Sequence, residues 1–193
     1  MNDEKARDYY TRKKFQATLK LYTDGIMVID WLPAGKTWYN LWLRVFIDEN
    51  RGYVAITGDA DDEVLCWYNP VKAEDLADYL AEFNYSEGKI QASKHLYTYN
   101  QKDIEVDIKN FFVDNELEPD ECESYCQLCD LIESQYVPPE AADILSEIDD
   151  TWWEYDFGKR LSPQFYYRHV GASMAIREVL KKLGYSEELS EDE

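Results

Sequence analysis

The sequence lacks a long apolar segment and is poor in the residue types that most catalytic and metal sites use. No stretch approaches the roughly 20 apolar residues that a membrane span needs. Among 193 residues there are only two histidines and four cysteines. The N-terminal segment is charged and has no apolar signal region, so we expect neither secretion nor membrane association. Three of the cysteines lie within eight residues, a poor disulfide framework, which favours a reducing cytoplasmic setting.

Several motifs of enzymes and nucleic acid-binding proteins are also missing. The chain has no glycine-rich phosphate loop, no Gly-x-Ser-x-Gly elbow and no His-Glu-x-x-His pair. It has no basic patch with interleaved aromatic residues, so direct binding to nucleic acid is not expected. No assembled catalytic or cofactor site can be named from the sequence, so we expect a binding protein without a cofactor rather than an enzyme.

Basic residues are outnumbered two to one. Forty Asp and Glu face twenty Lys and Arg, which gives a formal net charge of −20. Such a field repels nucleic acid and anionic membranes and attracts basic surfaces. The alternative interpretation is that the negative charge serves only to keep the protein soluble. Adaptation to high salt fits poorly, because thirteen lysines remain and aromatic residues make up 15% of the chain.

The charge is distributed unevenly along the chain. Residues 1–20 hold six basic and three acidic groups, whereas residues 101–160 hold eighteen acidic groups and four basic ones. A charge that only kept the protein in solution would be spread more evenly. The acidic part is therefore the candidate binding face.

Hydrophobic alternation predicts an antiparallel β-meander in the N-terminal part. Apolar residues alternate with polar ones from Phe15 onwards, as in half-buried strands, and glycine-containing turns separate the segments. The expected strands cover residues 15–21, 26–32, 39–47, 53–57 and 64–68. Short connections between successive strands are typical of a meander, here over about 15–68. A helical half follows, so the predicted fold class is α+β, with the helices mainly on one face of the sheet.

The period becomes helical after the fifth strand. Asn69-Pro70 is a typical helix start, and residues 89–92 are consistent with one further short strand. Further helices are expected near 3–13, 100–115, 119–134 and 138–149, and from Ser162-Pro163 to a C-cap at Gly184. We expect an α+β domain at 1–115 and a helical extension at 116–193, or both parts as one single domain.

Cys122, Cys126 and Cys129 are spaced like the iron–sulfur ligands of radical S-adenosylmethionine enzymes. Their acidic, helix-like context late in a short chain argues against a cluster. A zinc site needs a fourth ligand that only the tertiary fold could supply, such as Cys66, His95 or His169. The simplest interpretation is that the i, i+4 and i+7 positions share a helix face, where cysteine packs as a small apolar residue and binds no metal.

Three further places in the sequence are candidate sites. His169 lies on the apolar face of the last predicted helix, where a hydrogen-bonded core histidine is expected. His95 has no partner that the sequence identifies. Gly58-Asp59 begins an acidic turn whose carboxylates could hold Mg²⁺ or Ca²⁺, but the ligand pattern of a calcium loop is absent, and turn geometry alone explains the glycine.

Residues 3–115 combine a short helix, a meander and three short motifs. These motifs are Gly-Tyr-Val-Ala-Ile-Thr-Gly-Asp at 52–59, Cys-Trp at 66–67 and Gly-Lys-Ile at 88–90. In this order of elements the chain resembles small accessory proteins encoded by phages and prophages of Gram-positive bacteria. Some acidic proteins of that group are anti-CRISPR proteins that inhibit Cas9. The resemblance implies an anti-defence protein in the bacterial cytoplasm, with a Cas9-type effector as its partner.

Such an inhibitor would present carboxylates where an effector's basic channel holds phosphates. The predicted partner-binding residues are Asp103, Asp107, Asp114, Glu116, Glu118, Asp120, Glu121 and Glu123. On a helix near 100–115, the apolar residues Ile104, Ile108 and Phe111 would point inward and leave the aspartates free. Three alternatives stay open: a binding module for another basic bacterial protein, contacts through the aromatic-rich stretch 151–157, and a small metal-dependent enzyme.

Overall fold

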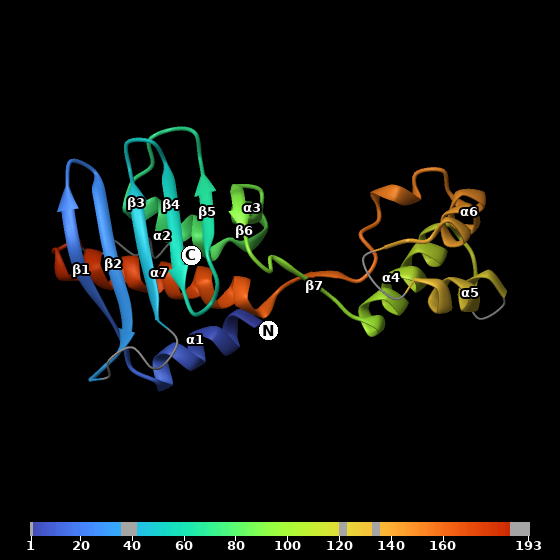
Figure 1. Cartoon of the computed structure of the whole chain (residues 1–193), viewed down its shortest axis with the longest axis horizontal. Coiled ribbons are helices and arrows are strands. Elements are labelled where there is room, and N and C mark those ends of the chain that lie inside the picture. The colour runs from blue at the N-terminus through green and yellow to red at the C-terminus, as the bar shows by residue number, and fades with distance from the viewer. Residues whose placement is uncertain (1, 36–41, 120–122, 133–135, 186–193) are drawn as a thin grey trace, which may run out of the picture. The chain divides into compact units, whose positions relative to one another are not determined.

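The computed structural model describes residues 2–35, 42–119, 123–132 and 136–185, and divides the chain into two compact units. The first, which we call the sheet unit, contains residues 1–96 and 163–193. The second, which we call the insertion, contains residues 97–162 and enters the sequence of the sheet unit between a strand and the last helix (Figure 1). This division differs from the expected domains at 1–115 and 116–193. A chain that leaves one unit and returns to it cannot be divided by a single boundary.

The sheet unit contains one antiparallel sheet of six strands whose spatial order follows the sequence. The strands are β1 (Phe15–Thr23), β2 (Ile26–Pro33), β3 (Leu43–Asp48), β4 (Tyr53–Gly58), β5 (Glu63–Cys66) and β6 (Ile90–Ser93). The predicted meander and α+β class are confirmed. The third strand begins at Leu43 rather than at residue 39, and residues 39–41 lie outside the described part.

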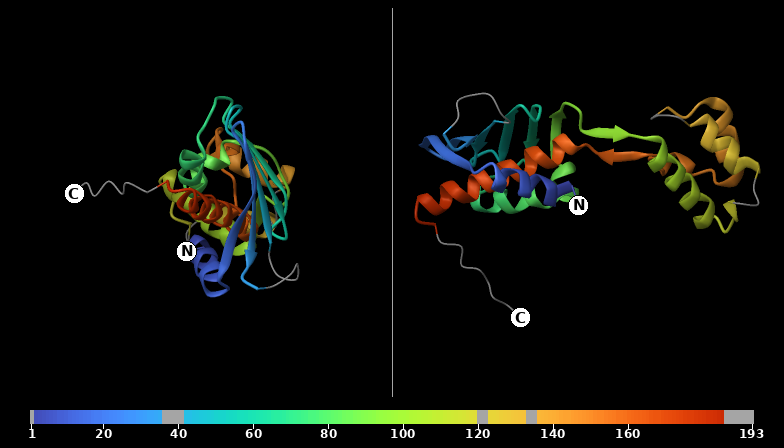
Figure 2. Two further views of the ribbon diagram at one scale, coloured as in Figure 1. Left: turned by 90° about the vertical axis from the view of Figure 1, so that its left-hand side faces the viewer. Right: turned by 90° about the horizontal axis from the view of Figure 1, so that it is seen from below.

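Three helices cover one face of this sheet, as the views in Figure 2 show. They are α1 (Asn2–Arg12), α2 (Ala73–Ala81) and α7 (Pro163–Lys182); the short α3 (Phe83–Glu87) follows α2. Side chains of the covered face, such as Ile29, Val45 and Ile56, lie opposite one another on successive strands and are almost fully buried. The burial of this apolar row beneath the helices stabilises the unit.

The close approach of α7 to the sheet depends on a residue without a side chain. A Cβ atom on Gly171 would lie 2.5 Å from Leu43 Cδ1 and 2.8 Å from the Tyr10 hydroxyl. The helix therefore packs against both the sheet and α1 only because this position is glycine. The helix begins at Pro163, and Gly184 follows its end with a φ of 87°, as expected.

The second helix begins three residues later than the sequence predicted. Asn69 and Pro70 precede an extended segment, and α2 starts at Ala73. The carboxylate of Glu49 accepts a hydrogen bond of 2.8 Å from the Ala73 backbone N–H, which satisfies one free donor of the helix N-terminus. The N-cap is thus supplied from 24 residues away, and a local motif could not reveal it.

The insertion has its own core. It opens and closes with a two-stranded antiparallel ladder, β7 (Tyr97–Tyr99) with β8 (Lys159–Leu161). Between these strands lie α4 (Gln101–Asp114), α5 (Glu123–Leu131), α6 (Pro139–Ile148) and a 3₁₀ turn, η2 (Trp152–Glu154). The predicted helices near 100–115, 119–134 and 138–149 correspond to α4, α5 and α6. In neither unit do the described residues include a helix that combines the length and apolar character of a bilayer span.

Candidate protein-interaction site

The negative charge of the chain coincides with a folding unit. The 66 residues of the insertion hold eighteen acidic and four basic residues, a net charge of −14. The other 127 residues hold 22 acidic and 16 basic residues, a net charge of −6. The acidic stretch at residues 101–160 therefore lies within one compact unit of the structure, which has its own electrostatic field.

The first helix of the insertion is fixed by a cap and an apolar stripe. The Asn100 side chain accepts a hydrogen bond of 3.0 Å from the Asp103 backbone N–H and caps the N-terminus of α4. Ile104, Ile108 and Phe111 are fully buried, at the spacing expected of an inward helix face. They pack with residues of α5, α6 and the segment before β8 in one core, which includes Leu128, Ile132, Ala141, Leu145 and Phe157.

Asp107 is not free for a partner, because the chain itself uses both of its carboxylate oxygens. The Arg160 guanidinium donates to Oδ2 and Oδ1 of Asp107 at 2.8 and 2.7 Å. The Gly158 backbone N–H also donates to Oδ2, at 2.7 Å. Asp103 lies on the same side of α4, with Oδ1 3.7 Å from Arg160 Nε. The expectation that these two aspartates are left unpaired is wrong, since they hold the β8 end of the insertion against α4.

Gly158 makes this arrangement possible. Its φ is 70°, and a Cβ atom there would lie 2.3 Å from Ile104 Cγ1. A side chain would thus clash with the first buried residue of α4, and glycine also tolerates the left-handed backbone. The close passage brings the Gly158 N–H to Asp107 and sets Arg160 beside it.

The other predicted residues differ in position. Asp114 is exposed at the end of α4, beside Tyr155; partial burial and this negative charge together raise the pKa of the Tyr155 hydroxyl. Glu116, Glu118 and Glu123 are exposed, and Asp120 and Glu121 lie outside the described residues. The insertion also has exposed carboxylates that were not among the predicted binding residues. They are Glu105, Asp130, Glu140, Asp143, Glu147, Asp150, Glu154 and Asp156.

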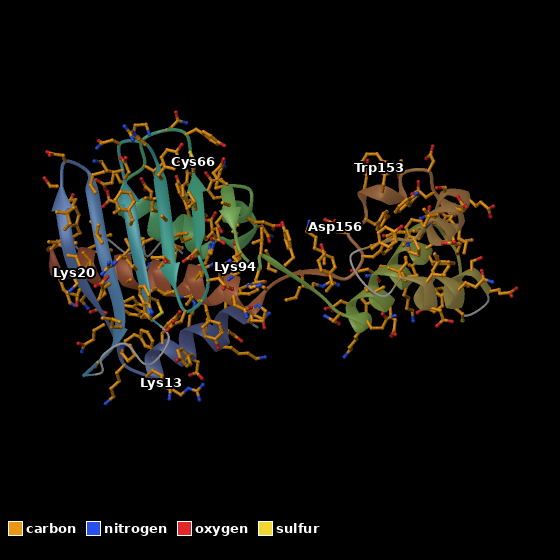
Figure 3. The ribbon with its side chains drawn as sticks, viewed as in Figure 1. Lys13, Lys20, Cys66, Lys94, Trp153 and Asp156 are labelled. Carbon is orange, nitrogen blue, oxygen red and sulfur yellow. The ribbon has the colours of Figure 1, made fainter. Side chains whose placement is uncertain are left out.

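A tryptophan projects from this acidic surface. Trp153, in η2, is 67% exposed and points away from the insertion core (Figure 3). Its neighbour Trp152 instead packs against the core, and its indole N–H donates to Ser146 Oγ at 2.9 Å. Asp150 and Glu154, on either side along the chain, are exposed. A large aromatic ring between carboxylates is the composition expected of an energetic centre in a protein interface.

The buried polar cluster of the sheet unit is the second candidate. Glu63 occupies an inward position of β5, in line with Ile56 on β4. Its carboxylate accepts from Arg168 Nη2 at 2.7 Å, from Ser93 Oγ at 2.9 Å and from His169 Nε2. Arg168 also donates to the Ala60 carbonyl at 2.8 Å. Burial alone would raise the pKa of Glu63, but the bonds from His169 and Arg168 outweigh it and lower that pKa.

His169 is hydrogen-bonded through both ring nitrogens. Nδ1 lies 3.0 Å from Ser86 Oγ, which itself donates to the Phe83 carbonyl, and 3.3 Å from the Leu80 carbonyl. Nε2 faces the Glu63 carboxylate, so neither ring nitrogen is left without a partner. The predicted core histidine is confirmed. The side chains of Glu63, Arg168 and His169 have no exposed surface, so the cluster offers a substrate no approach and joins α7 to the sheet.

The remaining candidate residues do not form a catalytic or metal site in the described part of the chain. Cys126 is exposed and Cys129 half-buried on α5, so they do not share an inward face as expected, and Cys122 lies outside the described residues. His95 Nδ1 lies 2.9 Å from Asp61 Oδ2. Asp59 accepts from the Trp42 backbone N–H at 3.2 Å, which holds the turn after β4 against the start of β3. Within the described residues, no three His, Cys, Asp or Glu side chains are grouped as metal ligands.

Comparison with known protein families, with curated proteins and with solved structures finds no match to this chain.

Proposed function

We propose that the insertion is a recognition unit that binds a basic protein surface. The observation that carries the proposal is the concentration of eighteen of the forty acidic residues in one separately folded unit of 66 residues. A unit with this charge attracts a basic partner over distances of about 10 Å at ordinary salt, and the attraction speeds the encounter.

Affinity in such an interface comes from a desolvated centre rather than from charge alone. Trp153, between the exposed Asp150 and Glu154, is the group on this surface best suited to that role. The surrounding carboxylates give specificity for lysine and arginine. The proposed contact residues are therefore the exposed Glu116, Glu118 and Glu123 together with the aromatic stretch 151–157, which the sequence analysis gave as an alternative.

The partner that fits this surface best is a protein with a basic channel for nucleic acid. Carboxylates held on a folded surface can occupy the positions of phosphates in such a channel. A Cas9-type effector is the first target to test, because the resemblance to anti-CRISPR proteins names it and the charge is of the required sign. Blocked loading of nucleic acid onto the effector is the expected consequence.

The test compares two variants of equal net charge. The insertion variant carries Glu105→Gln, Glu116→Gln, Glu118→Gln and Glu154→Gln, all at exposed positions. The control carries Glu4→Gln, Glu74→Gln, Asp75→Asn and Glu82→Gln, at exposed positions of the sheet unit. Both variants lose four negative charges. Kd for a purified Cas9–guide RNA complex is expected to rise only in the insertion variant. An equal rise in both would mean that overall charge, not the insertion, governs binding.

A further inference from the structure

The face of the sheet opposite the helices has an apolar row that crosses the strands. Leu21 on β1 pairs with Val28 on β2, Val28 with Phe46 on β3, Phe46 with Ala55 on β4, and Ala55 with Val64 on β5. On β2 to β5 these residues alternate with the buried ones, and a register shift between Leu19 and Leu21 turns Leu21 to the same side, so the row points away from the helices. We call this row the sheet strip.

The sheet strip is exposed at its centre as well as at its ends. Leu21, Phe46 and Val64 are 45%, 39% and 36% exposed, and Val28 and Ala55 are half-buried beside them. Phe46 lies on a central strand, where an outward residue of a two-layer α+β unit is ordinarily polar. All described helices of the sheet unit that pack on the sheet lie on the other face (Figure 2). A continuous apolar row of this kind indicates an interaction surface.

We propose that the sheet strip is the interface of a homodimer, in which two copies pack their sheets face to face about a two-fold axis along the strip. A flat sheet face complements itself under such an axis, as in sheets that stack about 10 Å apart. Phe46 then lies over Phe46 of the second copy. A second copy of the chain is the partner that this face favours because of the pattern of β3. On this strand Arg44 and Asp48 lie two residues on either side of Phe46 and point to the same face.

This axis reverses the strand direction between the copies, so Arg44 of one copy lies over the end of β3 that carries Asp48 in the other. The half-exposed Arg44 of each copy thus faces the end of the strip where Asp48, itself almost buried, lies in the other copy. Neither rim brings an unpaired charge into contact. Asp30 is held by Arg44 at 2.6 and 3.0 Å and by Lys20 at 3.7 Å, and Asp48 accepts from the Asn50 and Arg51 backbone N–H groups. Lys20 is labelled on β1 in Figure 3.

The sheet unit, which contains the strip, carries a net charge of only −6, so its own charge opposes the contact weakly. Five strands spaced by about 4.8 Å and a strip three outward residues deep give on the order of 500 Å² per copy. The total of about 1,000 Å² is at the lower limit of specific interfaces, so the expected dimer is weak and reversible.

Sedimentation equilibrium of the full chain between about 1 and 200 µM tests the proposal, a range suited to weak interfaces. The expected result is a mass that rises from 22.8 kDa towards twice that value, and more readily at high salt, since screening weakens the repulsion between copies. A mass of 22.8 kDa at every concentration would overturn the proposal.

Two variants of the sheet strip test where the interface lies, and a third variant, in the insertion, serves as the control. Phe46→Ser and, on the edge strand, Leu21→Lys are each expected to weaken the dimer about tenfold or more. Val113→Lys replaces an exposed valine of the insertion, 56% exposed, and is expected to leave the dimer unchanged. Unchanged thermal unfolding of Leu21→Lys shows that the fold is kept. A dimer that survives both strip variants, or is lost in the control, contradicts the proposal. The salt dependence distinguishes this dimer from the proposed complex with a basic partner, because the dimer strengthens as salt rises and the complex weakens.

Discussion

Glu63 Oε2 and Arg168 Nη2 lie 2.7 Å apart in an ion pair whose two side chains have no exposed surface. Arg168 reaches this position from α7, and Glu63 from β5, which are 105 residues apart in the sequence. The pair and its hydrogen bonds to Ser93 and to the Ala60 carbonyl join the last helix to the sheet on which it packs.

Removing one partner of this pair is expected to destabilise the sheet unit strongly. Arg168→Met leaves the Glu63 carboxylate buried without the guanidinium that pairs with it, and the free energy of unfolding should fall by about 3–5 kcal/mol. Urea denaturation measures the loss. Arg177→Met, which removes a partly exposed pair with Asp78 on the same helix, is the matched control and should cost less than about 1 kcal/mol. Equal losses would contradict the structural role of the cluster.

The lowered pKa of Glu63 predicts a dependence of stability on pH. A carboxyl group whose pKa is lower in the folded state stabilises the fold fully above its unfolded value, near 4.5, and loses this contribution as the pH falls through the folded value. The difference in unfolding free energy between wild type and Glu63→Gln should therefore shrink below pH 4.5. A difference that stays constant from pH 7 to about pH 3 would contradict the assigned pKa direction.

The insertion depends on Asp107 more than on its exposed neighbours. Asp107→Asn weakens the paired hydrogen bonds from Arg160, and the insertion should lose about 1–2 kcal/mol, because the pair is bidentate and half-buried. Asp114→Asn, at an exposed position of the same helix, should cost less than about 0.5 kcal/mol. Hydrogen exchange of amides in α4 measures both. Faster exchange in the Asp114 variant than in the Asp107 variant would contradict the assignment.

Gly158→Ala is expected to disturb the same contact from the backbone. The added methyl group would lie 2.3 Å from Ile104 Cγ1, at a φ of 70° that alanine adopts with strain. A loss of about 1–3 kcal/mol from the insertion is expected. Gly35→Ala, whose φ is also 70° but whose added Cβ meets no atom within 4 Å, separates backbone strain from the clash. Equal losses in the two variants would show that the Ile104 contact adds nothing.

The strands of the sheet unit could be predicted because their burial alternates locally. The alternation from Phe15 onwards predicts which residues face the helices, and the structure follows it except at Leu21, which the register shift after Leu19 turns to the other face. The same alternation contained a signal that was missed. Leu65 points inward on β5, so Glu63, two residues earlier, must also point inward, and a charged residue there requires a buried partner. The identity of that partner, Arg168, depends on the tertiary fold.

The insertion was visible in the sequence only as a change in charge. The acidic stretch at residues 101–160 nearly coincides with the insertion. Helical periodicity alone could not show that the chain leaves the sheet unit at residue 97 and returns at 163. The pairing of Asp107 with Arg160 spans 53 residues, so the sequence could not show that this aspartate is occupied. Exposed carboxylates such as Glu105 and Glu154 are better candidates for contact with a partner.

The binding of the two charge-neutralised variants to one basic effector tests the central claim most directly. Kd is measured for wild type, for the insertion variant and for the sheet-unit control on a purified Cas9–guide RNA complex, at low and at raised salt. The account predicts that wild type and control bind alike, that the insertion variant binds at least about tenfold more weakly, and that this difference narrows as salt rises. Binding by the insertion variant at wild-type strength, in the presence of measurable wild-type binding, would contradict it.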